Sequence, residues 1–428
     1  MELKNNQEIK KALIEAFQNH KKNNFKDAEN IYQKILKSNP EHFETIFYLG
    51  TLYSQLKKYD LAEPLFQKAI LINPSFKDTY QNLGFMYQQQ GDYQKAKECY
   101  EKLIQIDPKN IKVYYILGIL YQKLGIIEKA KDYFKKVIKI DPNYIDAHNN
   151  LGTCYQQSEN YLNAINSYIN ALKVNPNYII SLNNLSLVLK SIKFTNLQNN
   201  DLIKIKKLFL FLFKKNNINH TELFNNAKLF LFNEEEKKYI KKIICSEHEL
   251  LSNKIIKEKC EDEFFHLLLQ KSLVVDKFLE NLLTKIRFQL IYFFKKKNIK
   301  LIKKYKKFFI SLAEQCWLNE YIYYQTAEEG KFIDELKKKL ENNNQINEEE
   351  IIILSCYFPL YKSDIITKKI LNYKSSSNLF KNLILIQVKE PLNEIKFKNS
   401  IKSLNKISDN VSKKVRDQYE DNPYPRWK

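Results

Sequence analysis

The sequence contains very little glycine and very little arginine. Of 428 residues only seven are glycine and three are arginine, although 70 basic residues face 49 acidic ones. A doubly wound sheet that binds a nucleotide or S-adenosylmethionine needs glycines after its first strand, because only glycine lets the backbone approach the cofactor. A single glycine, Gly330, follows Gly152. The sequence therefore predicts no cofactor and no enzymatic site of this class.

The shortage of arginine also bears on the net charge of +21. Arginine is preferred for bidentate contacts to phosphate and guanine, so its scarcity argues against a specific nucleic-acid partner. Abundant Lys, Asn, Ile, Tyr and Phe indicate compositional drift, which is the favoured explanation of the charge.

Further absences concern metals, disulfides and membranes. The six cysteines are scattered without C-x-x-C spacing, so neither a zinc site nor a disulfide framework is expected. The amino terminus has no long apolar run after its charges, and the apolar stretches are far shorter than the roughly 20 residues of a spanning helix. We expect a cytoplasmic chain without a membrane span.

The few glycines and prolines that are present follow a strict period. Five prolines lie 34 residues apart, four glycines keep the same spacing, and five alanines fall in register with them. These are Pro40, Pro74, Pro108, Pro142 and Pro176; Gly50, Gly84, Gly118 and Gly152; and Ala28, Ala62, Ala96, Ala130 and Ala164. A fixed period of this length is typical of a helical solenoid. The fold class is therefore expected to be all-α: a superhelical solenoid, an irregular helical domain and an extended carboxyl-terminal tail.

The segment Tyr80–Pro108, YQNLGFMYQQQGDYQKAKECYEKLIQIDP, resembles the tetratricopeptide repeat. The resemblance covers five repeats from about Ile9 to Tyr178 and a further helix from Ile179 to Lys190, and predicts a domain over residues 1–190. Small residues let the two helices of each repeat approach, and aromatic residues fill the gaps. Pro64 breaks the period. It follows Asp60 and Glu63, a capping-box pairing that predicts a place in the first helical turn.

The resemblance implies that the first helix of each repeat lines a concave groove that binds a peptide or protein. Two residues before each periodic glycine, and before Ser186 at the glycine position of the sixth repeat, one row is expected to face this groove: Tyr48, Asn82, Ile116, Asn150 and Asn184. An asparagine amide can donate a hydrogen bond to a peptide backbone and accept one from it, whichever side chains the peptide carries. A second row, Gln88, Gln122 and Gln156, makes the groove polar. The alternative interpretation is that these amides are solvated surface in an Asn-rich chain.

The second half of the chain loses the period but keeps helical apolar spacing, which predicts a helical connector domain over residues 191–408. The basic stretch Lys295–Lys307 is interpreted as the solvated face of a helix. Cys260 with His266, and Cys245 with His248, are close in sequence but match no motif with a mechanism, so structural roles are favoured.

Two segments, Ser311–Glu329 and Val415–Trp427, resemble the connector of bacterial proteins in which tetratricopeptide repeats precede an S-adenosylmethionine-dependent methyltransferase domain. The resemblance implies that the catalytic domain is absent from this chain and is a further candidate partner. Two prolines favour an extended tail over residues 409–428. Its aromatic and guanidinium groups suit docking onto another surface, and they are Tyr419, Tyr424, Arg426 and Trp427.

Three functions follow as hypotheses. The first is a non-enzymatic scaffold that binds peptide or protein partners in the groove of its repeats. The second is the non-catalytic portion of a methyltransferase. The third is a glycosyltransferase-associated repeat protein, since O-linked N-acetylglucosamine transferases clamp peptides with a similar asparagine row.

Overall fold

The structure is a computed structural model, and it describes residues 6–193, 198–246, 249–343 and 345–400. Its secondary structure is helical throughout the described ranges. The chain divides into two compact units, Met1–Val188 and Leu189–Lys428, here called the repeat unit and the helical unit. Each unit is described by itself.

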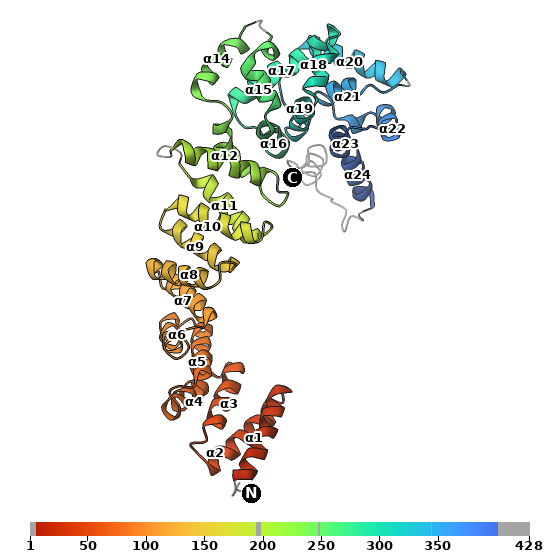
Figure 1. Cartoon of the computed structure of the whole chain (residues 1–428). Helices are drawn as coiled ribbons and strands as arrows, with labels where there is room; N and C mark the ends of the chain where they lie inside the picture. Colours follow the sequence, from red (N-terminus) through yellow and green to blue (C-terminus); the bar gives the residue numbers. More distant parts are fainter. Residues whose placement is uncertain (1–5, 194–197, 247–248, 344, 401–428) are drawn as a thin grey trace, which may run out of the picture. The chain divides into compact units, whose positions relative to one another are not determined.

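The repeat unit consists of helices that pack in consecutive antiparallel pairs (Figure 1). The helices are α1 (Asn6–Lys21), α2 (Phe25–Ser38), α3 (Phe43–Gln55), α4 (Tyr59–Ile72), α5 (Lys77–Gln90), α6 (Tyr93–Ile106), α7 (Ile111–Lys123), α8 (Ile127–Ile140), α9 (Ile145–Gln157), α10 (Tyr161–Val174) and α11 (Ile179–Ser191). In Figure 1 the pairs follow one another in chain order. The all-α repeat fold expected from the sequence is therefore confirmed.

Small residues provide the close contacts inside each pair. All five periodic alanines are fully buried. A Cβ atom placed on Gly50 would lie 3.2 Å from the ring of Phe66, and one placed on Gly118 would lie 2.6 Å from the ring of Phe134. In the pairs from α3 to α10, the first helix therefore comes close to the aromatic ring of the second at a residue without a side chain.

The turn between the two helices of each pair requires a left-handed residue. The residue at this point has positive φ in all five pairs: Asn23, Lys57, Gly91, Gly125 and Glu159. The next backbone N–H donates to the carbonyl five residues earlier, as Asp92 N does to Tyr87 O. This bond belongs to the Schellman end of a helix, for which glycine is the preferred residue. Only two of the five repeats have glycine at this position.

The position of Pro64 differs from the sequence prediction. Helix α4 begins at Tyr59, its N-cap is Lys58, and no side chain caps it, so Asp60 and Glu63 form no capping box. Pro64 therefore lies beyond the first turn, where it removes a hydrogen bond of the helix. The start of α4 is set by the left-handed turn at Lys57, which recurs in every repeat.

The helical unit is irregular. It contains α12 (Asn199–Phe213), α13 (His220–Ala227), η1 (Lys228–Phe230), α14 (Glu234–Ile244), η2 (Leu250–Ser252), α15 (Lys254–Glu261), α16 (Glu263–Lys271), α17 (Lys277–Lys295), α18 (Ile299–Lys304), α19 (Lys306–Leu318), α20 (Ala327–Asn342), α21 (Glu348–Ser355), η3 (Leu360–Lys362), α22 (Asp364–Asn372), α23 (Asn378–Ile384), η4 (Leu385–Lys389) and α24 (Glu390–Ser400). Helix α19 packs against α16, α21 and α23, and every residue from Phe308 to Trp317 is buried. No helix in the described ranges is long and apolar enough to cross a membrane.

Candidate functional site

The row of groove residues lies along the first helices of the repeats, and each of its members is half-buried. Helices α3, α5, α7, α9 and α11 supply one residue each: Tyr48, Asn82, Ile116, Asn150 and Asn184. The three asparagines and Tyr48 contact the first helix of the preceding repeat. We refer to Asn82, Asn150 and Asn184 as the asparagine ladder.

The amides of the ladder donate hydrogen bonds between repeats. Asn82 Nδ2 donates to Thr51 Oγ1 at 3.1 Å, and Asn150 Nδ2 donates to Tyr115 Oη at 3.0 Å. Asn184 Nδ2 donates to Asn149 Oδ1 at 3.1 Å, and Asn149 is itself buried. One proton of each amide is therefore used to hold neighbouring repeats together, and the second remains for another partner.

The asparagines of the ladder differ in whether the amide oxygen Oδ1 already accepts a hydrogen bond. Asn150 Oδ1 accepts from Asn149 Nδ2 at 3.3 Å. Within the described residues, the structure gives no donor to Oδ1 of Asn82 or of Asn184. At these two rungs the amide keeps both a donor and an acceptor, which is what a peptide backbone requires.

Apolar contacts replace the ladder at the other two rungs. The ring of Tyr48 lies 4.8 Å from that of Phe17, centroid to centroid. Ile116 packs against the core of the repeat unit. Tyr48 therefore joins adjacent repeats by packing, where the asparagines join them by hydrogen bonds, and Ile116 contributes to the core.

The three glutamines differ in their hydrogen-bond partners, because the second helix of the repeat carries either a tyrosine or a phenylalanine. Gln88 Oε1 accepts from Tyr100 Oη at 2.8 Å, and Gln156 Oε1 accepts from Tyr168 Oη at 2.9 Å. The corresponding residue beside Gln122 is Phe134, which has no hydroxyl. Gln122 Nε2 instead donates to Gln157 Oε1 of the next repeat at 3.2 Å. The alternation of Tyr and Phe thus decides which glutamine bonds inside its own repeat.

The sequence interpretation missed exposed apolar side chains at helical spacing from Asn82 and Asn184. Phe85 on α5 is 54% exposed, and Ile180 and Leu187 on α11 are 48% and 49% exposed. Phe85 lies three residues after Asn82, and Ile180 and Leu187 lie four before and three after Asn184. These spacings place them on the helix face that carries the ladder. The signal in the sequence was their spacing of three or four residues from an asparagine, which places them on the same helix face.

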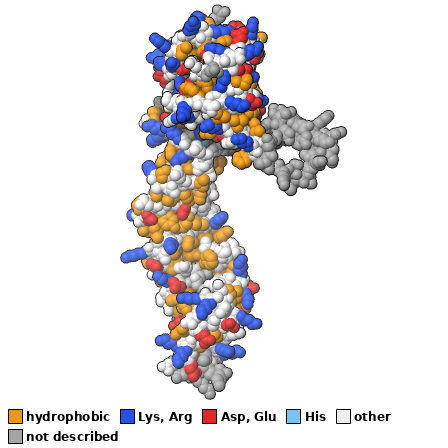
Figure 2. Space-filling model, turned by 90° about the vertical axis from the view of Figure 1, so that its right-hand side faces the viewer, with side chains coloured by type: hydrophobic (Ala, Val, Ile, Leu, Met, Phe, Trp, Pro, Cys, Tyr) orange, Lys and Arg blue, Asp and Glu red, His pale blue; other side chains and the backbone are white. Residues whose placement is uncertain are grey.

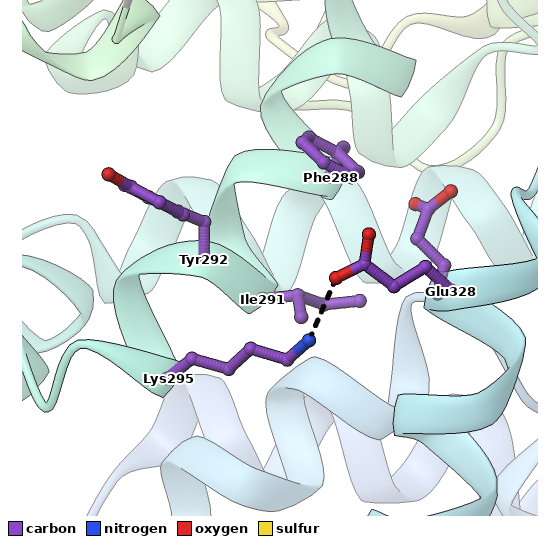
Figure 3. A pocket seen from close by; sticks show the side chains of 6 residues that line it. Phe288, Ile291, Tyr292, Lys295 and Glu328 are labelled. Atoms are coloured by element: carbon purple, nitrogen blue, oxygen red, sulfur yellow. Dashed lines mark hydrogen bonds and ion pairs between the residues drawn. The ribbon is translucent and has the colours of Figure 1, made fainter.

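A pocket in the helical unit lies between α17 and α20, and Figure 3 shows its lining. Phe288, Ile291 and Tyr292 form one wall, and Lys295 Nζ donates to Glu328 Oε1 at 3.2 Å. The volume is about 40 Å³, whereas ligand pockets usually measure about 300–1,000 Å³. The pocket is the size of one or two water molecules, which occupy about 30 Å³ each in the liquid.

Beside this pocket, buried polar groups hold the loop between α19 and α20. Arg287 Nη2 donates to the carbonyl oxygens of Tyr323 at 3.3 Å and Tyr324 at 2.5 Å. The guanidinium lies 4.2 Å from the ring centroid of Tyr357, whose hydroxyl donates to Glu329 Oε1 at 2.7 Å. Arg287, Tyr323, Glu329 and Tyr357 are almost fully buried, whereas the side chain of Tyr324 is exposed. Most of Ser311–Glu329, which resembles the methyltransferase connector, therefore lies in the core of this unit and in the loop between α19 and α20.

Two buried thiols, Cys316 and Cys356, lie in the same core. Burial opposes ionisation of Cys316, but hydrogen bonds from Cys356 and Arg287 and the charge of Arg287 outweigh it and lower the pKa of Cys316. Burial, together with the neighbouring Cys316, raises the pKa of Cys356 well above its usual range.

Of the two Cys–His pairs, only Cys260 with His266 lies within the described residues. His266 Nε2 bonds to the backbone carbonyl of Cys260 at 2.8 Å, and burial raises the pKa of the Cys260 thiol. His248 lies outside the described residues, as do Tyr419, Tyr424, Arg426 and Trp427 of the expected docking tail. In the described ranges no group of three or more His, Cys, Asp or Glu side chains could hold a metal ion.

Comparison with known proteins identifies the class of the repeats. The tetratricopeptide repeat family model matches residues 43–76, 78–110, 111–144 and 145–178. These segments are tetratricopeptide repeats, and α1–α2 adds a pair that the family model does not match. No curated protein matches the sequence.

Solved structures similar to this chain each cover about two fifths of it. A crystal structure of MamA is 24% identical, covers 40% of this chain and 95% of its own, and has a TM-score of 0.37. MamA from Desulfovibrio magneticus RS-1 is 18% identical, with coverages of 40% and 97% and a TM-score of 0.37. YrrB, described as a TPR protein with an unusual peptide-binding site, is 20% identical, covers 40% of this chain and 88% of its own, and scores 0.37.

Proposed function

We propose that the repeat unit is an interaction scaffold that binds an extended segment of a partner protein along its first helices. The observation that carries this proposal is the asparagine ladder. Each amide is oriented by one hydrogen bond to the preceding repeat, and Asn82 and Asn184 keep a donor and an acceptor for a peptide backbone. Each hydrogen bond gained would contribute about 0.5–1.5 kcal/mol.

The polar character of the face favours main-chain recognition over recognition of charge. The ladder and the glutamine row are uncharged, and on the face shown in Figure 2 acidic and basic side chains are interspersed along the repeats. A partner that relied on long-range attraction would require a surface of one sign. Backbone recognition is compatible with many side chains, as expected of a scaffold.

The test is a display selection with the full-length chain as bait. Random peptides of about twelve residues, which span about 40 Å when extended, are selected against the wild type. Their affinities are then measured for the wild type and for Asn82→Ala/Asn150→Ala/Asn184→Ala. We expect the triple variant to bind more than tenfold more weakly, since two to three backbone hydrogen bonds are lost.

A matched control separates binding from stability, because the ladder also joins repeats. Thr51→Val and Tyr115→Phe remove the acceptors of Asn82 and Asn150 but leave both asparagines in place. The double variant Thr51→Val/Tyr115→Phe should lose comparable thermal stability but much less affinity than the triple variant, because both amides remain and only their orientation is relaxed. Equal loss of affinity in both variants, or no selected peptide at all, would reject the proposal.

The methyltransferase resemblance is a hypothesis about a longer polypeptide. We infer that the chain as given binds no S-adenosylmethionine, because its sequence has no glycine loop for that cofactor. Calorimetric titration of the full chain with S-adenosylmethionine should give no saturable heat. A saturable signal at micromolar concentration would place a site in this chain and favour the enzymatic hypothesis.

A further inference from the structure

We infer that the groove of the repeat unit selects an extended peptide with apolar side chains at two positions about seven to nine residues apart and little charge between them. This inference rests on the proposed function and specifies its ligand. It is carried by the exposed residues Phe85, Ile180 and Leu187, which share helix faces with Asn82 and Asn184.

The geometry of α5 and α11 places apolar and amide groups side by side. Residues three, four and seven apart lie on one face of a helix, so Asn82 and Phe85 are neighbours on α5. On α11 the same rule gathers Ile180, Asn184 and Leu187. At both rungs a peptide whose backbone bonds to the amide would lay a side chain against apolar surface. Burying such a side chain is favourable in proportion to the area removed from water.

The two rungs between these anchors offer no comparably exposed apolar side chain. On α7, Ile116 and Ile119 are half-buried and packed against the core. On α9, Thr153 Oγ1 donates to the carbonyl of Asn149 at 3.2 Å and accepts from Tyr168 Oη at 3.4 Å. The apolar anchors therefore stand at the first and last rungs of a four-helix row.

The spacing of the anchors sets the peptide register. From α5 to α11 there are three steps between successive first helices. Packed helices lie roughly 8–10 Å apart, so the anchors are separated by about 24–30 Å. An extended chain rises about 3.3 Å per residue, which corresponds to roughly seven to nine residues between the two apolar side chains.

The charges beside this row balance one another. The groove faces of α5, α7 and α9 carry four charged residues, Asp78, Lys112, Lys123 and Asp146. Two are acidic and two are basic, and Asp146 already accepts a hydrogen bond from Tyr178 Oη at 2.6 Å. In a chain of net charge +21, this face is neutral and therefore fits an uncharged segment better than an acidic one.

The test uses the peptides recovered with the full-length chain. We expect them to share two apolar residues separated by about seven to nine positions. For the best peptide, Phe85→Gln/Ile180→Gln/Leu187→Gln should weaken affinity by about tenfold or more, as loss of apolar anchors does. The matched control is Leu71→Gln/Ile140→Gln. These residues are also exposed, at 82% and 53%, but lie on second helices, so the control should bind like the wild type.

The outcomes distinguish the inference from the function on which it rests. If selected peptides depend on the asparagine ladder but show no apolar spacing, and the glutamine variant binds normally, the inference is wrong and the scaffold function stands. If the selected peptides are acidic, the neutral-groove argument is wrong. If no peptide is enriched over the ladder-deficient triple variant, both proposals are overturned.

Discussion

The two units of this chain achieve a helical fold in opposite ways. In the repeat unit each contact recurs every 34 residues and depends on the absence of a side chain, as at Gly118 against Phe134. In the helical unit the core is aperiodic and includes the buried Arg287, held by backbone carbonyls. A repeating contact can be read from spacing alone, whereas a buried polar group depends on partners far away in the sequence.

Removing the buried guanidinium should have the largest effect. Arg287→Ala leaves the carbonyl groups of Tyr323 and Tyr324 without their donor and opens a cavity beside Tyr357. We expect the helical unit to lose about 3–5 kcal/mol of stability. Hydrogen exchange resolved by segment should show lost protection in the helical unit and unchanged protection in the repeat unit. Asn281→Ala, an exposed change on the same helix, is the control, and an equal effect of both would contradict the buried role.

Acid should affect the helical unit next, through two buried histidines. Burial lowers the pKa of His220 and of His266, and Nδ1 of each ring is buried without a partner. The unfolded chain, with an ordinary pKa of about 6.5, therefore binds protons first as pH falls. Stability present above about pH 6.5 is lost toward the lower folded pKa, by at most about 2 kcal/mol per histidine at pH 5.

Urea unfolding at pH 7 and pH 5 measures this loss. His220→Gln/His266→Gln should be less stable at pH 7 but show a smaller change between the two pH values. A wild-type midpoint that does not move between pH 7 and pH 5 would mean that neither ring is protonated preferentially in the unfolded chain.

Within the repeat unit, the glycines should differ in a graded way. A Cβ on Gly118 would lie 2.6 Å from the ring of Phe134, but one on Gly50 would lie 3.2 Å from that of Phe66. Gly118→Ala should therefore cost about 1–3 kcal/mol through overpacking. Gly50→Ala should be nearly neutral, since the higher helix propensity of Ala offsets about 1 kcal/mol. Thermal denaturation compares the two, and Phe134→Leu should relieve Gly118→Ala. Equal costs would refute the packing argument.

The smallest effect concerns the left-handed turns. Lys57 and Glu159 have φ values of 57° and 56°, where Gly91 and Gly125 stand in the equivalent repeats. Lys57→Gly and Glu159→Gly should each stabilise the chain by about 0.5–1 kcal/mol, because a Cβ is unfavourable in this conformation. Gly91→Ala and Gly125→Ala are the reciprocal changes and should destabilise by a similar amount. Chemical denaturation with the wild type as reference measures both directions.

Much of the repeat fold could be predicted because its determinants are local and recurrent. The periodic prolines end second helices, and the residue before Pro40, Asn39, lies outside the helical region at φ −138° and ψ 87°, in keeping with the disfavoured α conformation before proline. The groove row was predicted to the correct helices for the same reason. Pro64 was predicted wrongly, because the start of α4 depends on the turn register and not on the nearest capping residues.

The partners of the candidate site could not be predicted from spacing. Asn82 bonds to Thr51 and Asn150 to Tyr115, with different offsets along the chain. Gln122 differs from Gln88 only because its own repeat has Phe134 in place of a tyrosine. Such choices depend on which atom lies within about 3 Å after packing, and hydrogen bonds have no preference for sequence distance.

The sequence by itself determined the helical class, the 34-residue pairing and the positions of the close contacts, because helix ends and side-chain size act within a few residues. Tertiary structure alone decided that Phe85 and Ile180 remain exposed beside the ladder and that Arg287 is enclosed among backbone carbonyls. Exposure and desolvation depend on every neighbour in space, and in the helical unit those neighbours are brought together by packing without a repeating pattern.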